Sequence, residues 1–355
     1  CEDVIHSLWF FKEDYPELNV IAAGSLLEFA LKNLSSFGVG RVSSLFVYPM
    51  SFDEFLTATR QEGLLRIKRN SSPTNPLPEA FYNRLVEAFR SYMLVGGMPE
   101  AVATYTETGS YRYSSDIVNE IIQGYQDDFA KYGAKANPLL LRQTLISVAH
   151  QAGAKFVCSR VEGQYRSAEV KVALEMLKDA GLIIPTCHTD ANGVSLGAEI
   201  NERVVKYLIH DTGVLLGILG IDDDIDERIK EMMVADSIDL VDKGHVAEMM
   251  AGLELIKYSS PQTRHQLYYW QNMNKGTCAE VDYVIARSGS IVPIEVKSGV
   301  KGSMSSMYSL MRNPQKHIEM GIRCSLENFG TFESPDGKKI DIIPLYAISN
   351  LFAEK

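Results

Sequence analysis

Apolar and polar residues alternate in two runs near the carboxyl end of the chain, as they do in β-strands. The runs span residues 279–286 and 291–297, are rich in Val and Ile, and flank a Gly-containing turn at residues 287–290. This pattern predicts a β-hairpin. Because the side chains of a strand point alternately to its two faces, Glu295 and Lys297 are predicted to share one face, with apolar residues on the other.

The rest of the chain shows helical periodicity interrupted by short apolar runs and turn residues. We expect helices at residues 3–14, 26–31, 49–55, 79–95, 112–131, 138–150, 167–180 and 244–256, and short strands at residues 18–23, 44–48, 155–158, 182–188, 194–197 and 204–209. Ser51 followed by Glu54 predicts a capping box at the start of one helix. The Pro, Ser and Asn residues of 68–78 predict a long loop.

Two helices followed by a pair of strands, within residues 138–197, have the order of a winged helix. An Asn-Gly pair between residues 182–188 and 194–197 predicts a tight hairpin. Residues 131–178 hold eight Lys or Arg and three Glu, which is a local excess of positive charge. A basic winged helix predicts that residues 131–178 bind DNA. The alternative is a small packing domain with ordinary surface lysines.

Composition and charge narrow the class of protein. The 355 residues suffice for two or three domains, and 46% are hydrophobic against 23% charged, as in ordinary globular proteins. The net charge of −10 argues against a surface wholly covered by nucleic acid. Five scattered cysteines without a Cys-x-x-Cys pair predict a reducing compartment and neither a disulfide framework nor a zinc site. The chain has no signal-peptide pattern and no apolar run of ~18 residues, so we expect a cytoplasmic protein that does not bind membranes.

Carboxylates and a lysine of the predicted hairpin point to a metal site. Asp282 on the first strand can reach the face that carries Glu295 and Lys297, and Glu248 lies between apolar positions of the preceding predicted helix. Hard cations such as Mg²⁺ bind carboxylate oxygens and keep water positions open. A nearby lysine can hold the attacking water or offset phosphate charge.

We therefore predict Asp282, Glu295 and Glu248 as metal ligands, with Lys297 assisting catalysis. The alternative is a solvated strand face with an ordinary cross-strand ion pair. A second acidic run, residues 221–227, lacks the Gly and terminal Glu of a calcium loop, so we expect a solvated loop or helix start there.

A helix carboxylate, a strand Asp and a Glu-x-Lys strand resemble the active site of the PD-(D/E)xK, or restriction-endonuclease-like, nuclease fold. Further strings extend the resemblance over essentially the whole chain. They lie at residues 19–29, 39–41, 48–56, 95–102, 125–132, 211–216, 268–271, 279–283 and 293–298. Together they resemble a family of prokaryotic AAA+ ATPases that carry a C-terminal domain of unknown function with a restriction-endonuclease-like fold.

The resemblance implies an ATP-binding site whose first half lies upstream of Cys1. The chain contains no Gly-x-x-x-x-Gly-Lys-Ser/Thr string, and we expect an N-terminally truncated fragment whose full-length parent binds ATP. Ser25 matches the polar sensor position at a strand end, and Arg41 matches an arginine that follows Val-Gly. Such groups orient water near a γ-phosphate and stabilise its charge. The alternative for Arg41 is a surface ion pair.

These inferences predict a multidomain chain of α/β and α+β class. The expected domains are residues 1–67, the later half of an AAA+ domain; residues 68–130, a linker and a helical, lid-like region; residues 131–203, a winged helix; and residues 204–355, a restriction-endonuclease-like mixed sheet with flanking helices.

Three functions are compatible with this organisation. The first is an ATP-dependent, DNA-associated protein whose C-terminal site hydrolyses phosphodiesters with Mg²⁺. The second is an ATPase switch whose nuclease-like domain is inactive and serves binding or regulation. The third is a scaffold that binds another protein through Met304, Met307 and Met311, although their helical spacing favours a core face. AAA+ relatives assemble as rings, so the resemblance also implies a homo-oligomer.

Overall fold

A computed structural model describes most of the chain. The described residues are 10–11, 13–23, 43–130, 137–220, 245–272, 279–297, 299 and 302–352. Several expectations lie outside these residues, namely the roles of Ser25 and Arg41, the helix predicted at residues 26–31, most of the helix predicted at residues 3–14, Lys131 and Lys135 of the basic region, and the acidic run 221–227. Within the described part of the chain, no helix combines the length and the apolar character that a membrane span requires.

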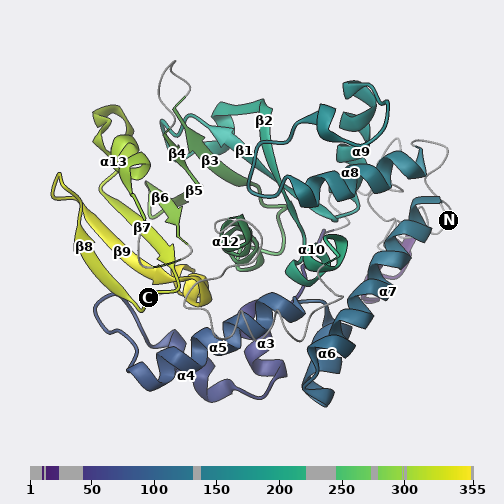
Figure 1. Cartoon of the computed structure of the whole chain (residues 1–355), viewed down its shortest axis with the longest axis horizontal. Coiled ribbons are helices and arrows are strands. Elements are labelled where there is room, and N and C mark those ends of the chain that lie inside the picture. Colours follow the sequence, from purple (N-terminus) through teal and green to yellow (C-terminus); the bar gives the residue numbers. More distant parts are fainter. Residues whose placement is uncertain are drawn as a thin grey trace.

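Helices occupy the first half of the described chain; in Figure 1, α3 to α6 lie below the sheets and α7 to α9 lie to their right. The α-helices are α3 (Phe52–Ala58), α4 (Glu62–Arg69), α5 (Glu79–Val95), α6 (Pro99–Thr108), α7 (Tyr111–Phe129), α8 (Pro138–His150), α9 (Ser167–Asp179), α10 (Thr212–Ile218), α12 (His245–Lys257) and α13 (Ser305–Arg312). The helices predicted at residues 79–95 and 138–150 match α5 and α8 at both ends. Asn137 caps α8 by accepting a hydrogen bond from Leu139 N, ahead of a proline in the first turn.

The start of α3 confirms the predicted capping box. Ser51 Oγ accepts a hydrogen bond from Glu54 N at 3.4 Å, and Glu54 Oε2 accepts one from Ser51 N at 2.7 Å. Phe52 N donates to Glu254 Oε2 of α12 at 3.2 Å. The first turn of α3 is therefore held both by its own cap and by a helix about 200 residues away in the sequence.

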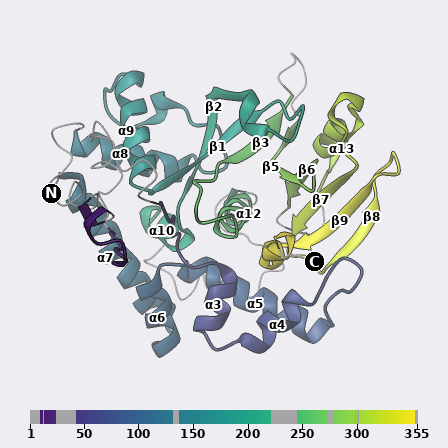
Figure 2. The same ribbon diagram turned by 180° about the vertical axis from the view of Figure 1, so that it is seen from behind.

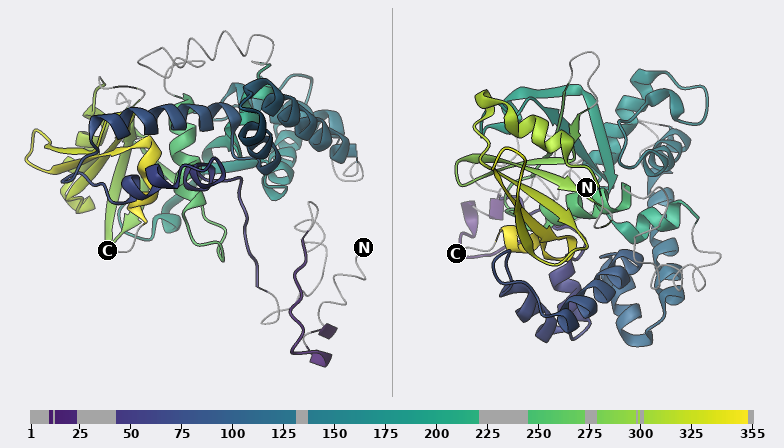
Figure 3. Two further views of the ribbon diagram at one scale, coloured as in Figure 1. Left: turned by 90° about the horizontal axis from the view of Figure 1, so that it is seen from below. Right: turned by 60° about the vertical axis from the view of Figure 1, so that its left-hand side comes forward.

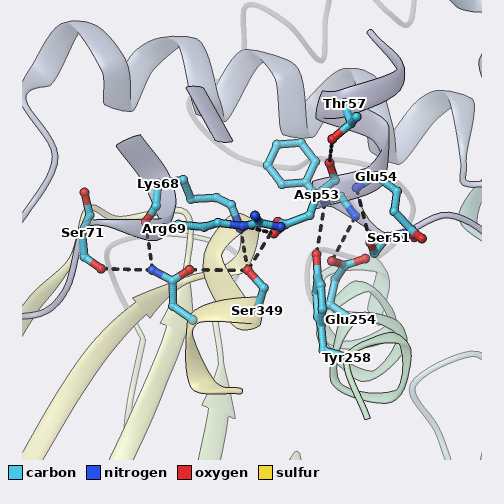
Figure 4. A network of polar contacts seen from close by, with 12 residues as sticks. Ser51, Asp53, Glu54, Thr57, Lys68, Arg69, Ser71, Glu254, Tyr258 and Ser349 are labelled. Carbon is cyan, nitrogen blue, oxygen red and sulfur yellow. Dashed lines mark hydrogen bonds and ion pairs between the residues drawn. The ribbon is translucent and has the colours of Figure 1, made fainter. Parts of the chain in front are cut away.

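Further polar contacts join α4 to α3 and to the 3₁₀ segment Leu345–Leu351 near the end of the chain (Figure 4). Lys68 and Asp53 form a buried ion pair, and Arg69 Nε lies 3.1 Å from the other oxygen of Asp53. Lys68 Nζ also donates to Ser349 Oγ at 2.5 Å. The early helices and the C-terminal part of the chain therefore pack as one body.

The strands that the structure describes form two mixed sheets. They are β1 (Ile183–Thr189), β2 (Ile200–Ile209), β3 (Leu267–Gln271), β4 (Glu280–Val281), β5 (Tyr283–Arg287), β6 (Ser290–Val296), β7 (Met320–Ser325), β8 (Gly330–Glu333) and β9 (Lys339–Pro344). The first sheet has the order β2-β1-β3-β4 and the second β5-β6-β7-β9-β8. Strands β6, β7 and β9 run parallel, and the edge strands β5 and β8 run antiparallel to their neighbours. The described residues thus have a mixed α and β architecture.

The hairpin predicted near the carboxyl end is confirmed. Strands β5 and β6 pair antiparallel, with Arg287 opposite Ser290. The two turn residues, Ser288 and Gly289, have φ values of 49° and 75°. Positive φ at both central residues is what a two-residue turn between twisted strands requires.

Helix α12 lies at the centre of the molecule, between the two sheets (Figures 1 and 2). Every residue from Val246 to Ile256 is buried. Gly252 permits α12 to approach β5 and β2 closely, because a Cβ at this position would lie 2.4 Å from Tyr283 Oη and 2.7 Å from Leu208 Cδ1. Tyr283 Oη donates to Glu248 O at 2.8 Å, which fixes α12 against β5.

Helix α13 packs on a second apolar cluster. Met304, Met307 and Met311 are buried there together with Trp270 and Val281. The core interpretation of these three methionines is therefore confirmed, and the partner-binding alternative for them is wrong.

The hairpin predicted within the winged-helix region has a different second strand. Strand β1 pairs with β2, and the predicted strand at residues 194–197 is replaced by the 3₁₀ turn Leu196–Glu199. Residues 155–158 form one isolated bridge instead of a strand. The order of two helices and a hairpin is kept, but β1 also pairs in parallel with β3. The hairpin therefore belongs to the first sheet, and the expected boundary between residues 203 and 204 falls inside β2.

Residues 18–23 and 44–48 are mostly exposed and form no strands, so the two apolar strands predicted there are wrong. Ile21 is 95% exposed, and the segment before α3 runs away from the body of the molecule (Figure 3). A strand needs a neighbour for its backbone groups. Phe46 N donates a backbone hydrogen bond to Pro261 O, a distant position in the sequence, at 2.8 Å.

Candidate functional site

Asp282 lies where the two sheets separate. Strand β4 pairs with β3 of the first sheet, and β5 pairs with β6 of the second. Asp282 is the residue between β4 and β5, so the chain passes from one sheet to the other at this carboxylate. Asp282 Oδ2 accepts a hydrogen bond from Val296 N at 2.7 Å. This bond ties the junction to the end of β6.

Strand β6 supplies Glu295, and Lys297 follows directly after its end. Lys297 Nζ lies 2.7 Å from Glu295 Oε1, so the two side chains share a face as the alternation predicts. Arg323 lies beside Glu295 in the register of β7. Glu295 is 5% exposed, and its Oε2 is buried without a hydrogen-bond partner. Such an oxygen is unfavourable unless a proton or a cation reaches it.

Helix α12 brings Glu248 to the same junction. Glu248 lies in the first turn of the helix, where the helix dipole favours a carboxylate. Its Oε1 is 2.8 Å from Lys206 Nζ of β2. The Lys206 ammonium is also 2.6 Å from Glu280 Oε1 of β4 and 5.0 Å from the centre of the Tyr269 ring. One buried lysine therefore joins α12 to the first sheet.

Glu280 extends this group toward the loop that follows α8. Its second oxygen lies 3.8 Å from Lys155 Nζ, and Lys155 also hydrogen-bonds the side chain of Gln271. We call the whole group the junction cluster; its members are Lys155, Lys206, Glu248, Glu280, Asp282, Glu295 and Lys297.

Burial and mutual repulsion raise the pKa values of the carboxyl groups in the junction cluster. Burial, together with the nearby Asp282 carboxylate, raises the pKa of Glu248 to about 8 and that of Glu295 to about 7. Burial also raises the pKa of Asp282. Burial opposes the charge of Lys206, but Glu248 and Glu280 outweigh it and raise the pKa of that ammonium. Lys206 therefore stays charged, while the carboxylates compete for protons or a cation near neutral pH.

The junction cluster offers a divalent cation two ligands rather than three. Within the described residues, no three His, Cys, Asp or Glu side chains are arranged to hold a metal ion together. Lys206 engages Glu248 and Glu280, which leaves Asp282 and Glu295. Mg²⁺ is commonly bound by one or two carboxylates, with water and substrate phosphates completing its shell. The unpartnered Glu295 Oε2 makes the residues compatible with this mode.

Three members of the junction cluster were not predicted from the sequence. Lys206 had a signal, since it is the lone charged residue in the apolar run of residues 204–209. Glu280 had a signal as well, since it lies two residues before Asp282 in the run 279–286, and alternation along a strand places both carboxylates on one face. Lys155 gave no local signal, because its contacts come from residues more than 100 positions later.

The region predicted to bind DNA carries a mixed surface. Basic side chains are exposed on α8, on α9 and on the connection between them, namely Arg142, Arg160, Arg166 and Lys171. Two glutamates of α9 are exposed as well, Glu169 and Glu175. Positive charge is therefore available there, although it is interspersed with negative charge.

Two family models match the chain. Residues 86–225 match a domain of unknown function (DUF8612), and residues 243–348 match another domain of unknown function (DUF4143). The second family is often found with AAA ATPases. No curated protein and no solved structure matches the chain. The second match contains all four carboxylates of the junction cluster, whereas Lys155 and Lys206 come from the first.

Proposed function

We propose that the junction cluster is a site for divalent-cation-dependent phosphodiester hydrolysis. Asp282 and Glu295 hold the cation, and Lys297 assists at the phosphate. The observation that supports this most strongly is Glu295 Oε2, a buried carboxylate oxygen without a partner. It belongs to a side chain whose other oxygen is 2.7 Å from Lys297 Nζ.

The side chains of the site have distinct roles in this proposal. A bound Mg²⁺ would supply positive charge to the phosphate and lower the pKa of a bound water. The bond from Val296 N orients Asp282. The side chain of Lys297 is 22% exposed, so its ammonium can reach a substrate while it remains close to Glu295. There it would donate to a phosphate oxygen or hold the attacking water.

The proposal extends to the remainder of the protein through the resemblance to AAA+ ATPases. The frequent occurrence of the second matched family with AAA ATPases supports an ATP-linked role, with Ser25 and Arg41 near the nucleotide. The exposed Arg142, Arg166 and Lys171 would contact the phosphate backbone of duplex DNA. Assembly as a homo-oligomer belongs to the same proposal.

A second function is favoured by Lys206. Its buried ammonium already neutralises Glu248 and Glu280, as a structural ion pair would. In this alternative the junction cluster does no chemistry, and the domain serves binding or regulation on an ATP-driven switch. Binding of a divalent cation separates the two functions, because only hydrolysis requires it.

Cleavage of supercoiled plasmid and branched DNA with Mg²⁺ or Mn²⁺, in the presence and absence of ATP, tests the proposal. We expect wild-type cleavage and a loss of at least about 100-fold in Lys297→Ala. Lys339→Ala is the matched control, because Lys339 Nζ lies 2.8 Å from Asp341 Oδ1 with the same two-residue spacing on β9. Equal losses in both variants, or no cleavage by wild type under any condition, would contradict hydrolysis.

A further inference from the structure

We propose that Lys206 is a built-in cation of the junction cluster that takes the place of a second divalent ion. The site then binds one divalent cation, at Asp282 and Glu295, and Glu248 is a positioning residue instead of a ligand. This inference rests on the proposed function, because it concerns how the same site holds its cation.

The contacts of Lys206 are those of a bound cation. Its side chain is buried, at 1% exposure for the residue. Its Nζ lies 2.8 Å from Glu248 Oε1 and 2.6 Å from Glu280 Oε1, and it faces the Tyr269 ring at 5.0 Å. Two carboxylates and an aromatic face from three different elements therefore surround one ammonium. A divalent ion at the same carboxylates would meet that fixed positive charge at close range.

The oxygens that remain available lie on the other side of the junction cluster. Asp282 uses Oδ2 for the hydrogen bond from Val296 N, and Glu295 Oε2 has no partner. The ammonium of Lys297 lies 2.7 Å from the other oxygen of Glu295, Oε1. The geometry thus separates the four carboxylates into a pair neutralised by Lys206 and a pair that can accept a cation.

Lys206 also links the two matched segments of the chain. It lies in the segment 86–225, and the carboxylates that it neutralises lie in the segment 243–348. The first segment therefore completes the charge balance of a site that the second segment builds. Because Lys206 holds Glu248 in the first turn of α12, it also fixes α12 relative to Asp282.

Mn²⁺ binding to the 355-residue chain tests this inference independently of activity. Calorimetry gives the stoichiometry, and the electron paramagnetic resonance spectrum of bound Mn²⁺ reports whether two ions lie close together. We expect one Mn²⁺ per wild-type chain and two neighbouring Mn²⁺ in Lys206→Met. Lys257→Met is the matched control, because Lys257 is a buried lysine 3.7 Å from Glu254 on the same helix and its loss is expected to create no site.

Glu248→Gln keeps the test decisive if Lys206→Met fails to fold. We expect this variant to keep one Mn²⁺ with a Kd within about threefold of wild type, whereas Glu295→Gln weakens binding by at least about tenfold. Two Mn²⁺ in wild type, one Mn²⁺ in a folded Lys206→Met, or an equal loss in Glu248→Gln and Glu295→Gln would overturn the role of Lys206 and leave the proposed function standing. No Mn²⁺ bound to wild type would overturn both.

Discussion

Helix α12 carries two buried glutamates whose surroundings differ. Glu254, 2% exposed, accepts hydrogen bonds from Phe52 N at 3.2 Å and Tyr92 Oη at 2.8 Å, and lies 3.7 Å from Lys257 Nζ. Glu248, 7% exposed, has one ion pair, with Lys206. At Glu254 each oxygen has a donor, and the partners come from helices.

The groups that shift the pKa values of Glu254 and Glu248 differ in the same way. Burial raises the pKa of Glu254, and the groups around it, Lys257 first, all act to lower that pKa. Burial also raises the pKa of Glu248; Lys206 acts to lower that pKa, but the Asp282 and Glu280 carboxylates act to raise it. A buried carboxylate surrounded by donors stabilises a fold. One crowded by like charges costs stability, and such crowding is typical of functional sites.

The largest effect on stability is expected from removing the Glu254 carboxylate, at one end of α12. Glu254→Ala removes the acceptor of Tyr92 Oη and of Phe52 N and leaves Lys257 without its carboxylate. We expect a loss of about 3–5 kcal/mol in the free energy of unfolding, measured by urea denaturation followed by circular dichroism. A loss below about 1 kcal/mol would show that this end is not the structural one.

The next effect is a dependence of stability on pH that arises at the Glu248 end. Glu248 and Glu295 have folded pKa values of about 8 and about 7 against 4.5 as their ordinary value. Their contribution to stability is therefore fully present below pH 4.5 and is lost as the pH rises through about 7 and about 8. For Glu295 alone the loss amounts to at most about 3.4 kcal/mol.

Urea denaturation at a series of pH values between 5 and 9 measures this dependence. Glu295→Gln is expected to flatten the decline, because the substituted amide does not titrate. The pH profile of Asp341→Asn, which changes a carboxylate of the same sheet outside the junction cluster, is expected to follow wild type. A wild-type stability that rises over this range would contradict the raised pKa values.

A smaller effect is expected where α12 meets both sheets. Gly252→Ala places a Cβ 2.4 Å from Tyr283 Oη, a hydroxyl that also bonds Glu248 O. We expect a loss of about 1–3 kcal/mol from overpacking, measured by thermal denaturation. Gly124→Ala on α7 is the matched control, since nothing lies within 4 Å of a Cβ there, and it should be neutral or stabilising.

The smallest effect is expected for Glu248→Gln at pH 8. Lys206 keeps Glu280 at 2.6 Å as a counter-charge in this variant, and the crowding of carboxylates is relieved. We therefore expect a change below about 1 kcal/mol in the free energy of unfolding. A loss as large as that of Glu254→Ala would remove the distinction between the two ends of α12.

Local signals in the sequence predicted much of the fold correctly. The capping box at Ser51 and the bounds of α8 depend on local sequence, so a few residues specify them. The hairpin of β5 and β6 follows from alternation and a two-residue turn. Helix α6 was missed because its threonines and the preceding glycines resemble a loop. A proline at its first position and the burial of Ala101 and Val102 stabilise it.

The candidate site was predictable only in part. Asp282, Glu295, Lys297 and Glu248 carry their signal in residue type and spacing, and they do meet at one junction. The role of Lys206 depends on where β2 lies relative to α12 and β4. No local pattern encodes that placement. The segments 18–23 and 44–48 are apolar runs that were predicted as strands and form none. An apolar run forms a strand only where a neighbouring strand is present to pair with it.

The central claim is that the Glu248 end of α12 borders a cation site, whereas the Glu254 end is structural. The most direct test is the change in thermal unfolding of wild type and Glu295→Gln when Mn²⁺ is added at pH 8. We expect Mn²⁺ at about 100 times its Kd to stabilise wild type by about 2.7 kcal/mol and to leave Glu295→Gln nearly unchanged. An equal shift in both proteins, or no shift in wild type, would contradict the claim.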